Sequence, residues 1–203
     1  MATELREIKS IGIAGAGGIG GYVCKLLYDF GVNRKQFPFS SWKIDVYDDD
    51  VVDVGNLLHQ DFSFDDLGRE KAQIMAEKYA VDSVLRFMTK EDFSKYDVIL
   101  SCVDSMTFRK DLYTYGWENP GKLFWIDGRC SSRNIGLYTS DIPKAKIEKD
   151  INDNTVRYGC LRQVDKENNT SHITPVIIAA MMMQTFLNHL RGEKLQDKLL
   201  LMI

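Results

Sequence analysis

The chain alternates between continuous apolar runs and stretches in which apolar residues recur at helical spacing. An apolar run at 11–14 leads into a stretch with one apolar face, which Gly31 is expected to end. The residues of this face are Val23, Leu26, Leu27 and Phe30. Apolar and polar residues then alternate over 42–46, as in a half-buried strand. Residues 10–47 therefore predict a β-α-β unit and a parallel sheet.

The same alternation continues toward the C-terminus, with no internal repeat. Helices are predicted at 68–80, after the capping residue Ser105, and from the pair Thr174-Pro175 onward. Further strands are predicted at the runs 84–88, 96–103, 123–126 and 135–139. This pattern predicts a doubly wound, Rossmann-like α/β fold, in which helices cover both faces of a mainly parallel sheet.

The length and composition are typical of a soluble globular domain, with 203 residues, 44% of them hydrophobic and 27% charged. We expect one domain over 1–203, interrupted by a polar, partly mobile connection at about 140–171. The last predicted helix carries an apolar stripe that consists of Val176, Ala180, Met183, Leu187 and Leu190. Such a stripe favours a homodimer, because closed two-fold pairing is the commonest oligomer.

Charge and cysteine usage exclude several classes of function. A formal charge of −3 provides no large basic field, so neither nucleic acid nor a membrane surface is expected as a partner. The longest apolar run, 173–183, contains Pro175, and residues 1–9 lack the apolar centre of a signal peptide. The four cysteines are scattered without C-x-x-C spacing, which favours reduced thiols in the cytoplasm over disulfides or structural zinc.

A glycine-rich loop joins the first predicted strand to the first helix. Gly15, Gly17 and Gly20 match G-x-G-x-x-G, and Gly18 lies between them. The first glycine allows a tight turn, the second lets a phosphate approach the backbone, and the third packs the helix on the strand. The free N–H groups at the helix N-terminus then attract an anion. The loop predicts nucleotide binding, although similar turns also occur for steric reasons alone.

Three consecutive carboxylates, Asp48, Asp49 and Asp50, follow the second predicted strand. They lie farther beyond the glycines than the ~20 residues typical of a dinucleotide fold. The arrangement makes sense if one carboxylate accepts ribose hydroxyl groups and another faces a divalent cation or a basic residue. A solvated acidic turn is the alternative.

Four motifs read together resemble the ThiF/MoeB/ubiquitin-activating superfamily of ATP-dependent adenylyltransferases. The first is the glycine loop, and the second runs from Asp48 to Gln60 with Asn56 inside it. The third is Asp66-Leu67-Gly68-Arg69-Glu70-Lys71, and the fourth is Cys102-Val103-Asp104. The resemblance covers about 11–192 and is that of a short, stand-alone member.

The resemblance implies a role for each motif. The glycine loop would hold ATP, Asp48 would accept hydrogen bonds from its ribose, and Lys71 would neutralise phosphate charge. Asp104 would bind the Mg²⁺ that bridges the phosphates. Asn56 and Gln60 would contact the phosphates, with Asp50 in a supporting electrostatic role.

The implied reaction is adenylation of a carboxylate with release of pyrophosphate. In the superfamily, the carboxylate belongs to the C-terminal glycine of a ubiquitin-like or sulfur-carrier protein. This chemistry depends on positioning and charge neutralisation more than on a protein nucleophile.

The chain departs from the superfamily pattern in its phosphate-binding cations. His59 stands where an arginine is usual, so a permanent cation is replaced by a group with an unperturbed pKa of ~6.5. Few residues precede the first strand, where a partner subunit usually supplies another arginine. Arg129, Arg133 or Arg69 are the candidates to compensate.

The zinc-binding C-x-x-C pairs of many members are also missing, and Cys160 is all that remains of the first pair. Some members form a thioester after adenylation. Cys160 and Cys130 have basic neighbours that could lower a thiol pKa, and Cys160 is the candidate nucleophile. Cys24 and Cys102 are expected to be buried packing residues.

Two other classes of function stay open beside the adenylyltransferase. A nicotinamide-dependent oxidoreductase is disfavoured by the displaced acidic residue and by the lack of an evident proton donor. A non-catalytic nucleotide-binding relative of the same fold is compatible with His59 and the missing N-terminal arginine.

Overall fold

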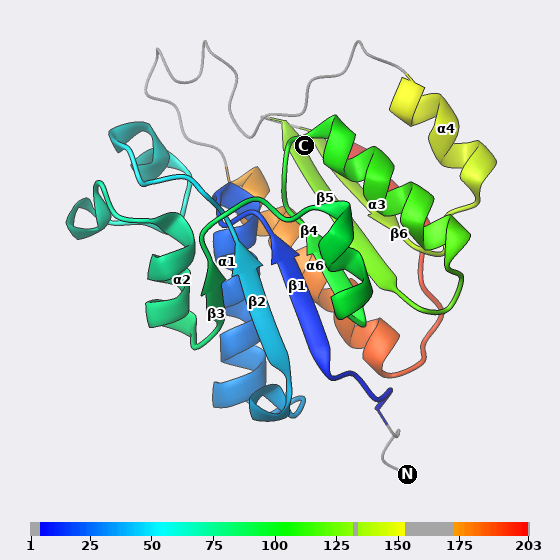
Figure 1. Cartoon of the computed structure of the whole chain (residues 1–203), viewed down its shortest axis with the longest axis horizontal. Coiled ribbons are helices and arrows are strands. Elements are labelled where there is room, and N and C mark those ends of the chain that lie inside the picture. Colours follow the sequence, from blue (N-terminus) through cyan, green and yellow to red (C-terminus); the bar gives the residue numbers. More distant parts are fainter. Residues whose placement is uncertain (1–4, 132–133, 153–172, 203) are drawn as a thin grey trace.

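A seven-stranded sheet with order β3-β2-β1-β4-β5-β6-β7 forms the centre of the molecule (Figure 1). The computed structural model describes residues 5–131, 134–152 and 173–202. Five strands pair in parallel, and these are β1 (Ser10–Ala14), β2 (Lys43–Tyr47), β3 (Asp82–Val84), β4 (Val98–Ser101) and β5 (Phe124–Ser131). β6 (Asn134–Thr139) and β7 (Lys198–Met202) add in antiparallel fashion. The strand order reverses between β1 and β4, which is where ligands bind in open α/β sheets.

Helices cover both faces of this sheet, as predicted (Figure 1). One face is covered by α1 (Gly18–Tyr28), α2 (Lys71–Tyr79) and α6 (Thr174–Leu190). The other face is covered by α3 (Met106–Glu118) and α4 (Lys144–Asn152). Short helical turns are η1 (Asp29–Asn33), η2 (Phe39–Ser41), η3 (Val54–Leu58), η4 (Phe64–Asp66) and η5 (Lys90–Lys95). None of the helices that the structure describes is long and apolar enough to span a bilayer.

Strand alternation sends neighbouring side chains into two separate cores. Ile11 and Ile13 of β1 are fully buried among α1 and α6, on one side of the sheet. Gly12 faces the other side, where a Cβ would lie 2.7 Å from the terminal methyl of Met88 and 2.9 Å from the ring of Tyr96. Gly12 therefore lets these two side chains pack directly against the middle of the sheet.

The first helix does not end at Gly31 as predicted. α1 runs into the wider turn η1, which contains Gly31. A Cβ on Gly31 would lie 2.6 Å from both Phe37 and Phe39. The glycine is thus required by the close packing of two aromatic residues and not by a left-handed helix end.

Three other predicted boundaries were wrong. The strand expected at 84–88 is instead β3 at Asp82–Val84, and 85–88 leaves the sheet. α2 begins at Lys71 and not at residue 68, because Gly68 has a φ of +75° that no helix contains. β5 extends to Ser131, well beyond the predicted end at 126, because antiparallel pairing with β6 prolongs it.

The segment 140–171, predicted as a polar connection, and the last helix also differ from their predictions. The segment 140–171 contains the helix α4, and 153–172 lie outside the described residues. Thr174 is the first residue of α6 and not its cap. Because α6 packs against α1, β5 and β6 together, its buried face is rotated from the predicted stripe, and Ala180 is exposed. The buried residues of α6 are Thr174, Pro175, Ile178, Ala179, Met182, Met183, Phe186, Leu187 and Leu190.

His189, near the end of α6, is a pH-sensitive part of this packing. Its ring stacks on Phe124 with 3.5 Å between ring centroids and an interplanar angle of 5°. Burial, with Arg6 nearby, lowers the pKa of His189 from 6.5 to about 4. The unfolded chain therefore binds a proton below about pH 6.5 that the folded chain does not bind until about pH 4.

We predict that the free energy of unfolding falls as the pH is lowered from about 6.5 to 4. His189→Phe keeps the ring on Phe124 but removes the titrating group, so this part of the pH dependence should disappear. Urea unfolding of both proteins at several pH values measures the effect. If the free energy of unfolding falls equally steeply with pH in both proteins between about pH 6.5 and 4, the prediction is wrong.

Candidate active site

The glycine loop after β1 has the geometry that its spacing predicts, and its glycines meet different constraints. Gly15 has a φ of +91°, and a Cβ there would lie 3.2 Å from the carbonyl oxygen of Cys102. A Cβ on Gly20 would collide with the carbonyl oxygen of Gly15. At Gly17, in contrast, the nearest atoms belong to the Gln60 amide, at 3.8 and 3.9 Å. No backbone atom therefore crowds Gly17, and both Gly17 and Gly18 line the cavity.

A cavity of about 830 Å³ opens over this loop, at the carboxyl ends of β1, β2 and β4. The sequence-predicted site residues that line it are Gly15, Gly17, Gly18, Asp48, Asp50, Asn56, His59, Gln60, Lys71 and Asp104. Gly20 lies behind the loop, where it supports the turn. Cys160, the predicted thioester nucleophile, lies outside the described residues.

Asp48 fixes the glycine loop in addition to facing the cavity. Its Oδ2 accepts a hydrogen bond from the backbone N–H of Ala16 at 2.7 Å, and its Oδ1 accepts one from the N–H of Asp50 at 2.9 Å. Burial raises the pKa of Asp48 above its usual value, while the two N–H groups and Lys71 oppose that shift. Each carboxylate oxygen keeps a further lone pair for a ligand.

Lys71 enters the cavity as half of an ion pair. Its Nζ donates to Asp50 Oδ2 at 2.9 Å, and its side chain is only 7% exposed. The backbone supports this pair, because the N–H of Lys71 donates to the carbonyl of Asp50 at 2.9 Å. Carboxylate oxygens of Asp48, Asp49 and Asp50 also lie within 4.8 Å of one another, a spacing at which a cation can be held.

The segment between β2 and α2 places Asn56, His59 and Gln60 against the cavity. Asn56 is tied to its own turn, since its side-chain oxygen accepts from the N–H of Asp53 at 3.0 Å. Asp53 in return accepts from the N–H of Asn56 at 3.1 Å. Gln60 Nε2 lies 3.4 Å from His59 Nε2. The two residues therefore face the cavity as a contacting pair.

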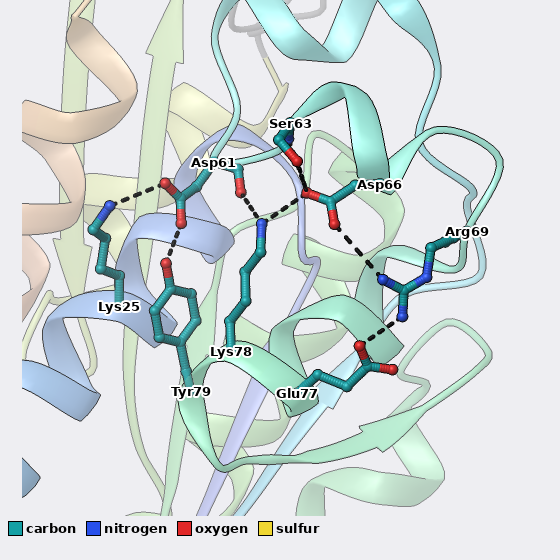
Figure 2. Close-up of polar contacts among 8 residues, drawn as sticks. All are labelled: Lys25, Asp61, Ser63, Asp66, Arg69, Glu77, Lys78 and Tyr79. Atoms are coloured by element: carbon teal, nitrogen blue, oxygen red, sulfur yellow. Dashed lines mark hydrogen bonds and ion pairs between the residues drawn. The ribbon is translucent and has the colours of Figure 1, made fainter.

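Figure 2 shows the polar network that holds this segment in place. Asp61, directly after Gln60, accepts from Lys25 of α1 at 3.0 Å and from the hydroxyl of Tyr79 of α2. Lys78 Nζ donates to the carbonyl of Asp61 at 3.1 Å and to Asp66 at 2.8 Å. The network anchors both ends of the segment to the helices beneath it.

Two of the three arginines expected to compensate for His59 are described, and both lie outside the lining of the cavity. Arg69 points to the outer surface, with its Nη2 2.6 Å from Glu77 (Figure 2). Arg129 lies within β5, fully buried, and its Nε donates to Asp127 at 2.7 Å. Neither lines the cavity, and Arg133 lies outside the described residues.

Arg109, which the sequence analysis did not identify, does line the cavity. It is 1% exposed and shares the buried face of α3 with Leu112 and Tyr113. The sequence contained a signal for this position, because a charged residue precedes two apolar core residues by three and four positions and so shares their helix face. Asp104, at the start of the turn before α3, is exposed toward the cavity.

The described cysteines differ in their surroundings. Cys24 is buried as predicted, and burial raises its pKa to about 12. Cys102 is only partly buried, contrary to prediction, because β4 ends at Ser101 and not at the predicted residue 103, which leaves Cys102 in the lining of the cavity. Cys130 is buried in the core beside α6 and also borders the cavity, whereas Arg129 faces α3. Strand alternation therefore separates this thiol from the basic neighbour that the sequence suggested.

The fold and this cavity define a Rossmann-like α/β protein with an open site at the point where the strand order of its sheet reverses. The ThiF family model matches residues 2–201, and the chain therefore belongs to the ThiF family.

Solved structures with the same fold include E. coli MccB with ATP, at a TM-score of 0.66 and 17% identity over 96% of this chain and 60% of that one. PaaA has a TM-score of 0.64 and 16% identity over 96% of this chain and 61% of its own. E. coli TcdA, a tRNA N6-threonylcarbamoyladenosine dehydratase, has a TM-score of 0.64 and 17% identity over 91% and 86%. The chain thus spans about 60% of the length of MccB and PaaA. No curated protein matches the chain.

The contrast between Gly17 and Gly20 generates a stability prediction. Gly20→Ala places a methyl group on the carbonyl of Gly15 and should lower the free energy of unfolding by about 1–3 kcal/mol. Gly17→Ala makes only ordinary van der Waals contact with the Gln60 amide at a negative φ and should change the free energy of unfolding by less than about 1 kcal/mol. Thermal or urea unfolding compares the two variants. Equal destabilisation would show that the loop is packed differently.

Proposed function

We propose that the protein uses Mg·ATP to adenylate the carboxylate of a protein or peptide substrate. The observation that carries the proposal is the convergence of the open glycine loop, Asp48, Lys71 and Asp104 on one cavity. Membership in the ThiF family supports it, as does the fold shared with MccB, which was solved with ATP.

The cavity has a suitable chemical group for each part of the nucleotide. The N–H groups at the start of α1 face phosphate, and the gap above Gly17 admits it. The free lone pairs of Asp48 accept from the ribose hydroxyls, and Lys71 exchanges part of its contact with Asp50 for phosphate oxygens. Asp104 would hold Mg²⁺, with Asp50 within the same cavity to support it.

Catalysis in this scheme is orientation and charge neutralisation. A substrate carboxylate oxygen attacks the α-phosphorus, the bond from that phosphorus to the bridging oxygen breaks, and pyrophosphate leaves. Mg²⁺ would offset the charge that develops on the leaving group. Lys71 and the N–H groups of the loop stabilise the same charge without forming a covalent bond.

For the substrate, we propose the C-terminal glycine of a ubiquitin-like or sulfur-carrier protein. An exposed C-terminal carboxylate can enter a cavity that opens at the sheet edge. E. coli MccB, which shares this fold, was solved together with MccA, and this supports a macromolecular partner. The role of Cys160 as a thioester nucleophile remains a prediction. So does the homodimer, although most of the α6 stripe that suggested it is buried within the chain itself.

The assignment of Asp104 can be tested by calorimetric titration with ATP, with and without Mg²⁺. The wild-type protein should bind ATP more tightly when Mg²⁺ is present, and Asp104→Ala should lose at least roughly tenfold of that gain. Lys110→Ala, on the exposed side of α3, is the matched control and should behave as wild type. Tight binding of NAD with no response to Mg·ATP would favour the oxidoreductase instead.

His59 generates a pH prediction, because it lines the cavity at a position where the superfamily uses arginine. Phosphates beside the imidazole favour its charged form, so ATP binding should strengthen as the pH falls from about 8 to 6. His59→Arg should bind ATP more tightly at pH 8 and show little pH dependence, because guanidinium stays charged. Affinities of both proteins across this range provide the measurement. Parallel curves would mean that His59 does not face the phosphates.

A further inference from the structure

A buried carboxylate, Asp127 of β5, collects hydrogen bonds from four side chains on the α3 side of the sheet. Its Oδ1 accepts from Arg109 Nε at 3.1 Å and from Ser101 Oγ at 2.8 Å. Its Oδ2 accepts from Arg129 Nε at 2.7 Å and from the hydroxyl of Tyr113. Asp127 is 0% exposed, so these contacts replace all of its hydration.

The charges of this cluster fix its protonation state. Burial alone would raise the pKa of Asp127, but the guanidinium groups of Arg109 and Arg129 bring that pKa below its usual value. Asp127 is therefore ionised at neutral pH. Two buried cations depend on this one anion, and a buried charge without its partner is strongly destabilising.

Arg109 uses its remaining nitrogens on the backbone next to the cavity. Nη2 donates to the carbonyl oxygen of Val103, and Nη1 lies 3.4 Å from the carbonyl oxygen of Asp104. One planar guanidinium thus connects a carboxylate in the sheet to two consecutive peptide groups in the turn before α3. Its fork of donors makes these contacts in one fixed geometry.

The turn that Arg109 holds is the one that presents Asp104. Over the ranges 5–131, 134–152 and 173–202, no hydrogen bond or ion pair fixes the carboxylate of Asp104 itself. The direction of that carboxylate is consequently set by its own backbone, and the backbone is held by Arg109.

We propose that Arg109 and Asp127 are positioning residues that aim the Asp104 carboxylate into the cavity. This inference rests on the proposed function, in which Asp104 meets Mg²⁺. The cluster acts through the backbone: Asp127 orients Arg109, Arg109 fixes the carbonyl groups of Val103 and Asp104, and the turn then holds its side chain toward the metal.

Two variants separate positioning from general stability. Arg109→Lys keeps a positive charge beside Asp127 but loses the planar fork that reaches both carbonyl oxygens. Tyr113→Phe removes a hydrogen bond from the same carboxylate, at the oxygen that Arg109 does not use. Tyr113→Phe is therefore the matched control, because it perturbs Asp127 without releasing the turn.

The first measurement is amide hydrogen exchange in the ligand-free protein. Arg109→Lys should speed exchange at residues 103–106 by roughly tenfold or more, while Tyr113→Phe should leave these amides as in the wild type. Unchanged exchange in Arg109→Lys, or an equal change in both variants, would overturn the positioning role. This readout requires neither ATP nor metal.

The second measurement is the Mg²⁺ dependence of ATP affinity. Arg109→Lys should lose roughly tenfold or more of the Mg²⁺-dependent gain and keep its metal-free affinity, as is typical when the support of a metal ligand is removed. If Arg109→Lys shows the same Mg²⁺-dependent gain in ATP affinity as the wild-type protein, the proposal is contradicted. If Asp104→Ala also keeps the full Mg²⁺-dependent gain in ATP affinity, Asp104 does not bind Mg²⁺ and the proposed function is wrong at this residue. The hydrogen-exchange result then still tests whether Arg109 holds the turn.

Discussion

The approach of α1 to the end of β1 is the contact on which the cavity depends. Gly20 lies against the carbonyl oxygen of Gly15, and Gly15 adopts a left-handed conformation directly under the backbone of Cys102. Because these glycines bring helix and strand together, the first N–H groups of α1 point out at the carboxyl edge of the sheet. Asp48 then fixes the loop from the neighbouring strand through the N–H of Ala16.

Two buried or half-buried polar clusters extend this arrangement to the loops on either side. The Asp61 network in Figure 2 fastens the segment that carries His59 and Gln60 to α1 and α2. The Asp127 cluster fastens the turn that carries Asp104 to β5. In both, a carboxylate accepts several hydrogen bonds, so the loops that line the cavity are held by helices and strands beneath them.

The lining of the cavity contains more acidic than basic side chains, which fits the proposed binding of a nucleotide that carries its own cation. The acidic side chains in its lining are Asp48, Asp50, Asp53, Glu91, Asp104 and Asp111. The lysines and arginine among the same lining residues are Lys71, Lys90 and Arg109. Lys71 is paired with Asp50 and Arg109 with Asp127, so a free polyanion finds little unpaired positive charge there. In the proposed function, backbone N–H groups and a divalent cation would supply the positive charge that these side chains do not.

The sequence by itself determined the parts of the protein that depend on neighbouring residues. The β1-loop-α1 unit, the cap at Ser105 and the acidic end of β2 all follow from local backbone preferences and spacing, and the structure places them as predicted. Tertiary structure alone decided which charges reach the cavity. Arg129 was expected there, but antiparallel pairing with β6 extends β5 through it and buries it on Asp127. Packing of α3 on β5 likewise brought Arg109 to Asp127, because a buried carboxylate requires cations from whichever helix packs above it.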